Sequence, residues 1–392
     1  MLTRRAAGLA ALALLMGPSC AAVPGHAKAT RLRGQRAPGH ALVPEPADFE
    51  VPAGVVVLHY YGVGGWGVRW GPTYLLTAPY FSHHSVFSLF ASKMLRGVQL
   101  APDRVAVRRG FEGTPVSSTT AILIGHGHVD HAGDVSAFFA KGLIEGTPVL
   151  IADRSTTNEL AALAPKFGCI APIEAWDPEG SVLRCPVPGV RITPLHHAHS
   201  PHFELAGLQV NAFGGRYDAP RRVLPRRSDD YKIGNTWAFL IDLLDATGAV
   251  VFRIHYVDAA AGPPHGMVPA SLLAERDVDI HIGCVPGFEQ TDEYPDALLE
   301  HLRVKYVLAG HWEDFFQPGV DLLQPLRGIL DDEAIDRFLA RVEQQLPRGR
   351  GVVPLNKRDV DCAAPRRCGP RGEAWALPLP GETFQFATGS VR

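Results

Sequence analysis

The stretch His126-Gly127-His128-Val129-Asp130-His131 decides how the rest of this sequence is interpreted, because it places three imidazoles and a carboxylate within six residues. The residues directly before it, 121–124, read Ala-Ile-Leu-Ile and predict a buried strand. Neutral imidazole and carboxylate are the ligands that zinc and similar divalent metals prefer. Gathering such groups away from water without a cation would be costly. The sequence therefore predicts a metal site at the end of a strand.

A His-x-His-x-Asp-His motif after an apolar strand resembles the metallo-β-lactamase-fold hydrolases, and the resemblance extends over residues 54–311. It implies an α/β fold, a four-layer αββα sandwich in which two sheets pack face to face with helices outside. It also implies two divalent metal ions, Zn first, with Fe or Mn as alternatives. His126 and His128 would hold one ion, and Asp130 and His131 would help to hold the other. Asp130 would in addition orient the nucleophile.

The resemblance implies a later histidine ligand after another strand, for which residues 190–195 are the predicted strand. The sequence His196-His197-Ala198-His199-Ser200-Pro201-His202 follows it. The His-Ser-Pro-His pattern favours His199 as the ligand, whereas counting from Thr-Pro favours His197. Both assignments stay open here, and the spare histidines, including His196, are expected beside the centre or at the surface.

Two further strands end at expected ligands. Residues 248–257 are apolar and β-branched, and Asp258 follows as the expected bridging carboxylate, although an Asp at this place can also simply form a turn. Residues 304–309 predict another strand, and His311 follows as the last ligand. The remaining histidines lack such a context and are interpreted as core or surface residues: His59, His255, His265, His281 and His301.

One position departs from the resemblance. Residues 74–82 match a segment that carries Leu-Thr-Asp-Pro in a branch of N-acyl-phosphatidylethanolamine phospholipase D-type and ascorbate-6-phosphate lactonase-type enzymes, which are not typical β-lactamases. Here Ala78 stands where an Asp supports the metal ligands. Loss of such a support typically costs about tenfold to a hundredfold in metal affinity or activity. His83 or His84 could supply it instead, or both could lie at the surface.

The composition limits the classes of binding partner that are expected. The chain has 392 residues, is 46% apolar and carries a formal net charge of −2, so it can bury a core but has no overall charge for binding nucleic acid. A small-molecule or lipid-like substrate is the expected partner. Residues 214–232 form either a solvated loop or a rim that attracts an anionic substrate. Five arginines lie in this loop: Arg216, Arg221, Arg222, Arg226 and Arg227.

The N-terminal residues 1–22 have the layout of a secretory signal, with two arginines before a short apolar run. Cys20 could be lipidated and tether the chain to a membrane. We therefore expect an exported protein, either periplasmic or a membrane-anchored lipoprotein. Residues 23–49 predict a linker, residues 50–345 the hydrolase domain and residues 346–392 a C-terminal extension.

Export favours disulfides. Cys169 is expected to pair with Cys185, and Cys362 with Cys368, the second pair lying in the C-terminal extension. Cys284 falls in an apolar run and predicts a buried free thiol.

Three helices are predicted, at residues 136–143, 156–164 and 332–345. The expected reaction is hydrolysis of an ester, phosphodiester or lactone by a water that two metal ions activate. The sequence has no Gly-x-Ser-x-Gly elbow to suggest a serine nucleophile. Two alternatives stay open: iron-dependent redox chemistry on the same ligands, and a weakly active or non-catalytic metal-binding envelope protein.

Overall fold

The computed structural model describes residues 51–77, 79–174, 185–201, 203–205, 208–210, 213–317, 323–346, 352, 354–355 and 369–388. Outside these ranges lie the predicted signal and linker, Cys20, Ala78 and the predicted pair Cys362 and Cys368. Within them, no helix is both long and apolar enough to cross a membrane.

The first sheet has seven strands among the described residues. In spatial order they are β15 (Thr383–Ala387), β1 (Val55–Gly62), β2 (Gly65–Trp70), β3 (Thr73–Leu76), β4 (Thr119–Ile124), β5 (Val149–Asp153) and β6 (Cys169–Ile173). Strands β15, β1, β2 and β3 pair antiparallel, whereas β3 to β6 run parallel. The apolar run predicted at residues 121–124 is thus a central parallel strand, which is buried on both faces.

The second sheet has six strands in the described part of the chain. In spatial order they are β14 (Trp375–Ala376), β13 (Tyr306–Gly310), β12 (Ile280–Cys284), β11 (Val250–Tyr256), β10 (Thr236–Leu244) and β7 (Val190–His197). Strand β10 is antiparallel to both β7 and β11, and β11 to β14 run parallel. Consequently β7, β11 and β13 all end at the same edge of this sheet. A small separate ribbon pairs β8 (Phe203–Leu205) with β9 (Leu208–Val210).

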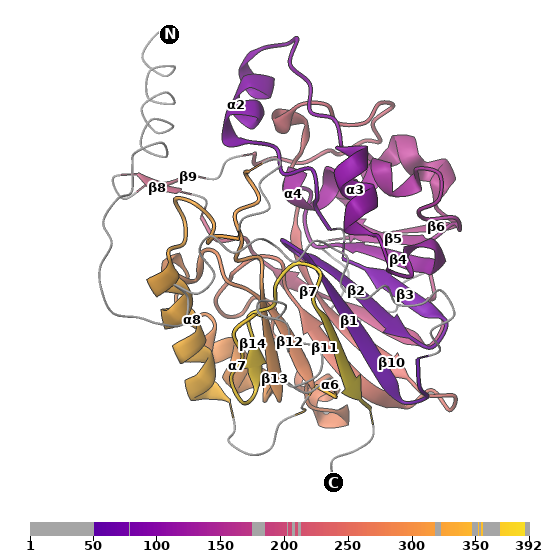
Figure 1. Cartoon of the computed structure of the whole chain (residues 1–392), viewed down its shortest axis with the longest axis vertical. Coiled ribbons are helices and arrows are strands. Elements are labelled where there is room, and N and C mark those ends of the chain that lie inside the picture. Colours follow the sequence, from indigo (N-terminus) through magenta and orange to yellow (C-terminus); the bar gives the residue numbers. More distant parts are fainter. Residues whose placement is uncertain are drawn as a thin grey trace.

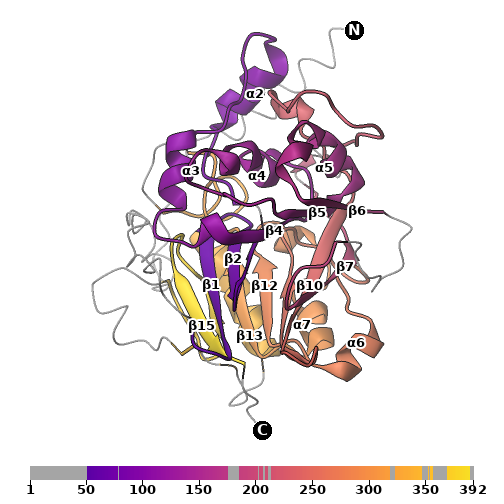
Figure 2. The same cartoon turned by 90° about the vertical axis from the view of Figure 1, so that its right-hand side faces the viewer.

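The two sheets pack face to face with helices outside, as Figures 1 and 2 show. Leu58 and Leu123 of the first sheet share one buried apolar cluster with Phe239 and Ile254 of the second. Helices α3 and α5 cover the outer face of the first sheet, and α7 and α8 cover that of the second. The predicted four-layer αββα sandwich is confirmed.

The helices are α2 (Val86–Met94), α3 (Arg104–Gly110), α4 (Val129–Ala132), α5 (Arg154–Glu159), α6 (Ala270–Glu275), α7 (Asp296–Leu302) and α8 (Asp332–Gln345). Short 3-10 turns are η2 (Val116–Ser118), η3 (Val135–Phe139), η4 (Ala161–Lys166), η5 (Ser228–Asp230) and η6 (Phe288–Gln290).

Only one of the three predicted helices has its predicted bounds. Helix α8 begins where Asp331 caps it by accepting a hydrogen bond from the backbone of Ala334. The helix predicted at 136–143 is wrong: η3 is a 3-10 turn, and Gly142, with a φ of 79°, follows it in the left-handed region. The helix predicted at 156–164 divides into α5 and η4, which contains Pro165.

The described C-terminal residues belong to both sheets. Strand β15 pairs with β1 along Val55–His59, and β14 pairs with the edge of β13. Residues 369–388, which lie in the segment predicted as an extension, therefore complete the sandwich.

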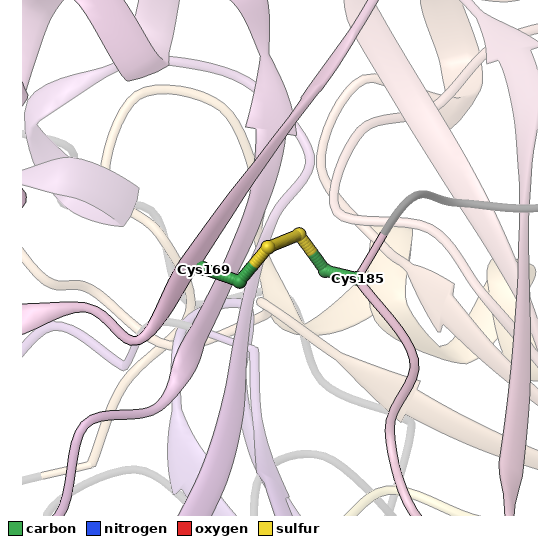
Figure 3. The surroundings of a disulfide bond; sticks show 2 residues. All are labelled: Cys169 and Cys185. Carbon is green, nitrogen blue, oxygen red and sulfur yellow. A yellow bond between two sulfur atoms is a disulfide. The ribbon is translucent and has the colours of Figure 1, made fainter.

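A disulfide joins the two sheets at one end. It links Cys169, the first residue of β6, to Cys185, shortly before β7, with their Cα atoms 6.0 Å apart (Figure 3). Since β6 and β7 are edge strands of different sheets, the bond connects the sheets across the sandwich. This predicted pair is confirmed, and Cys284 is buried and free as expected.

Candidate metal centre

The candidate ligands follow the ends of four strands. His126 lies two residues after β4, His199 two residues after β7 and Asp258 two residues after β11, while His311 directly follows β13. The backbone N–H of Trp237, at the start of β10, donates to the carbonyl of Gly125 at 2.9 Å. This bond holds the end of β4 against the second sheet, so the ligands of the two sheets meet.

The motif after β4 turns directly into helix α4. His128 is the residue before this helix, and its carbonyl accepts from the backbone N–H of His131 at 3.0 Å. Asp130 and His131 lie in the single turn of α4. A loop followed by one helical turn therefore presents all four side chains of the motif to the same region.

Glycines at 125 and 64 allow the ligands to approach the backbone. A Cβ on Gly125 would lie 2.4 Å from the Asp258 carboxylate, and a Cβ on Gly64 would lie 2.8 Å from the His131 ring. Real Cβ atoms do not come so close, so both positions require glycine for a close approach. The glycine-rich turn between β1 and β2 is thus one wall of the centre.

The predicted ligands gather into three overlapping groups, and within each group the ligand atoms lie within 4.8 Å of one another. The groups are His126 with His128 and His199, His126 with His131 and Asp258, and Asp130 with His131 and His311. His126 and His131 each belong to two groups. The arrangement is two neighbouring ligand sets, with Asp258 between them.

Asp258 contacts both sets. Its Oδ1 lies 3.1 Å from Nδ1 of His126, and its Oδ2 lies 3.7 Å from Nδ1 of His131. Asp130 has the same relationship within the second set, because its Oδ2 lies 3.3 Å from Nε2 of both His131 and His311. Each carboxylate is therefore shared between imidazoles, as a bridging or chelating ligand would be.

Several buried polar atoms of the centre make no hydrogen bond to any described residue, among them Nε2 of His126 and Oδ2 of Asp258. Such atoms are rare in folded proteins, because leaving a buried polar group unpaired costs about 1–3 kcal/mol. A divalent cation would satisfy them. Imidazole and carboxylate together form a donor set suited to zinc, and they also accommodate iron or manganese.

The charges of three candidate ligands are those that metal binding requires. Burial lowers the pKa of His131 to about 4, so the ring is neutral at pH 7. Burial alone would raise the pKa of Asp258 and of Asp130, but the neighbouring histidines outweigh it and hold both pKa values below the ordinary range. Neutral imidazole and ionised carboxylate are the forms that bind metals. His311 differs: burial alone would lower its pKa, but the hydrogen bond and charge of Asp130 raise it.

The structure places the two alternatives left open after β7 in different surroundings. His199 lies in the first ligand set, whereas Nε2 of His197 pairs with the carbonyl of Ala259 at 2.9 Å. The ring of His196 packs against that of Trp237 in a tilted arrangement, with 4.5 Å between the ring centroids. Among the described residues, only His199 of this run joins a ligand group.

Other histidines lie apart from the three groups. His255 and His281 are buried and share a contact of 2.9 Å between their Nδ1 atoms. His83 and His84, considered as substitutes for the support missing at Ala78, both contact Tyr80.

Two supporting residues could not be recognised from the sequence. The hydroxyl of Tyr60, on β1, accepts a hydrogen bond from the backbone N–H of His311 at 3.0 Å and donates to Glu313. His311 has a φ of 62°, a left-handed conformation that few non-glycine residues adopt without support. Tyr60 therefore holds the backbone of a candidate ligand. Tyr60 lies 251 residues before His311, so no pattern in the sequence around His311 points to this contact.

Similarity to known proteins is confined to the fold of the chain. No protein-family model matches the chain, and no curated protein matches its sequence. Among solved structures, the chain is similar to a metallo hydrolase from the archaeon Ignicoccus hospitalis (13% identity, 85% of this chain and 98% of that one, TM-score 0.40). It is also similar to a metallo-β-lactamase-fold protein from Bacillus subtilis (13%, 66% and 85%, TM-score 0.36) and to an isothiocyanate hydrolase from Delia radicum gut bacteria (13%, 84% and 99%, TM-score 0.45). All three TM-scores are below 0.5, and the phospholipase D-type or lactonase-type branch stays a prediction.

Proposed function

We propose that this protein is a metal-dependent hydrolase with two metal ions, acting on an ester, phosphodiester or lactone. One observation carries the proposal: seven residues from four strand ends form two adjacent ligand sets around Asp258. A single structural metal would need only one closed set of about four ligands. The observed arrangement instead fits a pair of cations.

The residues divide between the two ions. His126, His128 and His199 would hold the first, and Asp130, His131 and His311 the second, with Asp258 shared between them. When bound, such a pair lowers the pKa of a water between the ions and neutralises charge that develops on the attacked oxygen. Zinc suits the five imidazoles best, with iron or manganese as alternatives.

The carboxylates have separate tasks. Asp258 would set the spacing of the two sets, because its two oxygens face different histidines. Asp130 is partly exposed, unlike Asp258, and would orient the nucleophile toward the substrate by accepting its proton in a hydrogen bond.

The arginine-containing loop of residues 214–232 favours an anionic substrate. The residues directly before and after it border the centre: the ring of Phe213 lies 6.4 Å from that of His128, and the carbonyl of Ile233 accepts from the backbone of Gly127 at 3.2 Å. Arg222 and Arg226 are exposed on this loop. Cations near a site raise the local concentration of anionic substrates.

Metal analysis joined to a substrate panel tests the proposal. The purified chain, saturated with zinc, is assayed on neutral and anionic esters, phosphodiesters and lactones, beside Asp258→Asn and a control, His265→Ala, whose histidine lies outside the three groups. We expect turnover in the wild type and the control and at least about a hundredfold loss in Asp258→Asn.

Two outcomes would replace the proposal. Stoichiometric iron with oxygen-dependent turnover would establish the redox alternative. Full metal loading with no turnover on the whole panel, together with turnover by an Ala78→Asp variant, would favour the weakly active or non-catalytic alternative. For the arginines, Arg222→Gln with Arg226→Gln should reduce turnover of anionic substrates more than of neutral ones, and equal losses would contradict their role.

A further inference from the structure

Exposed apolar side chains are concentrated on one part of the surface. Of the six large apolar residues that are exposed in the described part of the chain, four lie on residues 85–100 or 213–232, which we call the cap. They are Phe87 (67% exposed), Met94 (52%), Leu95 (58%) and Val223 (58%). Exposed large apolar side chains that gather on one part of a surface often mark a contact site.

The two segments of the cap form one unit. The Oγ of Ser92, on α2, accepts from the backbone of Ser228 at 3.0 Å, and the carbonyl of Lys93 accepts from Arg227 at 2.7 Å. The carbonyl of Arg226 accepts from the backbone of Leu100 at 2.6 Å. Figures 1 and 2 both show α2 and this loop side by side at the top of the molecule.

The cap is cationic in a chain that is slightly acidic. It holds eight basic and three acidic residues, a net charge of +5, whereas the whole chain has −2. Its three acidic residues pair with arginines of the same loop, at 3.1 Å for Asp218, 2.9 Å for Asp229 and 3.2 Å for Asp230. Five cations remain beyond these pairs: Lys93, Arg96, Arg222, Arg226 and Lys232.

Apolar and cationic residues lie next to one another at the exposed edges of the cap. The four residues Lys93-Met94-Leu95-Arg96, at and just after the end of α2, are all exposed, while Leu89 and Ala91 of the helix are buried. In the loop, Arg222 and Val223 are exposed together. This is the composition of an amphipathic helix that lies in a membrane interface, with apolar side chains among the acyl chains and cations at the headgroups.

We propose that the cap docks the protein on an anionic lipid surface. The charge of the cap favours an anionic partner, and the exposed apolar residues beside the cations favour a lipid surface over a purely polar anion. The cap also reaches the metal centre, since the Lys93 ammonium lies 5.3 Å from the Phe213 ring, which in turn contacts His128. Docking would therefore bring a lipid surface beside the site. The inference concerns binding and stands independently of the proposed hydrolysis.

Hydrogen exchange on the full chain tests the proposal directly at the two segments of the cap. The backbone exchange of residues 85–100 and 213–232 is measured without vesicles, with phosphatidylcholine vesicles, and with vesicles that contain about 30% phosphatidylglycerol. We expect slower exchange in the cap only with the anionic vesicles, and recovery at high salt because the charges are screened. Because exchange is measured segment by segment, slowing in the cap can be distinguished from any vesicle binding through the N-terminal residues.

Surface variants give the second arm. Met94→Ser with Leu95→Ser should raise the lipid concentration for half-maximal binding about tenfold, and Arg222→Gln about fivefold. Leu355→Ser is the matched control, since Leu355 is exposed but outside the cap. Unchanged exchange in the cap with anionic vesicles would overturn the proposal. Equal vesicle binding by the Met94→Ser, Leu95→Ser variant and by the Leu355→Ser control would also overturn it. A third contrary result would be a dimer in solution that only the cap variant dissociates, with no slowing of exchange in α2 by vesicles.

Discussion

The hydroxyl of Tyr60 donates to the carboxylate of Glu313 at 2.7 Å, joining the first sheet to the loop after β13. The same hydroxyl accepts from the backbone N–H of His311, so one buried side chain fixes both ends of this short segment. The carboxylate of Glu313 also accepts from the backbone of Val63, in the glycine-rich turn. One buried pair, Tyr60 and Glu313, thus holds the backbone of the glycine-rich turn and that of His311.

Replacing Tyr60 by Phe should weaken metal binding without unfolding the protein. The change leaves the His311 N–H and the Glu313 carboxylate short of a partner, so His311 is held less firmly. We expect metal affinity to fall about tenfold to a hundredfold, measured by competition with a chelator. Tyr61→Phe is the control, because it removes a buried hydroxyl that bonds to Tyr74 instead. Equal affinity in both variants would show that Tyr60 does not position His311.

Gly125→Ala should displace Asp258, because the added methyl would lie 2.4 Å from its carboxylate. We expect a loss of stability of about 1–3 kcal/mol, as overpacking usually causes, and metal affinity reduced at least about tenfold. Gly146→Ala is the matched control, since no heavy atom lies within 4 Å of its added Cβ. Normal metal affinity in Gly125→Ala would argue against Asp258 as a ligand.

The same residues show what the sequence could predict. The strand-end motif follows from a local pattern: an apolar run, then residues with the right chemistry. The order of the later ligands came from the family resemblance, and the pairing of Cys169 with Cys185 from their closeness in the sequence. The helix at 332–345 could also be predicted from its own segment, because its apolar residues recur at helical spacing; in the structure an Asp caps it.

Long-range features gave no such signal. The pairing of β15 with β1 joins residues about 330 positions apart, and the contact of Tyr60 with Glu313 spans 253. Neither follows from periodicity, which reports only local backbone geometry. The choice between His197 and His199 likewise depended on the turn after β7. The prediction of a helix at 136–143 was wrong because the residue types of this segment are compatible with an α-helix and with a 3-10 turn alike.

Removing the disulfide should lower stability while the fold persists. Because Cys169 and Cys185 close a loop with a sequence separation of 16, the variant Cys169→Ser with Cys185→Ser should lose about 2–4 kcal/mol. Chemical denaturation with guanidinium measures the loss. The double variant is preferable to a reductant, which would act on other cysteines as well. A midpoint equal to that of the wild type would contradict the prediction.

Zinc should stabilise the protein, because the folded chain alone assembles the ligands. At a free concentration about a hundredfold above the dissociation constant, each site adds about 2.7 kcal/mol to the free energy of unfolding. Thermal unfolding of chelator-treated protein, with zinc or calcium added back, measures this. Calcium prefers oxygen ligands and should raise the melting temperature less. His126→Ala should lose most of the zinc response, since His126 belongs to two of the three groups. A zinc response that persists in full would place the ion elsewhere.

The most direct test of the central claim is anomalous diffraction from crystals of the zinc-loaded protein. Two ions per chain are predicted, one held by His126, His128 and His199 and the other by Asp130, His131 and His311, with Asp258 touching both. A single ion held by one of these sets, or ions bound by other residues, would contradict the two-metal centre.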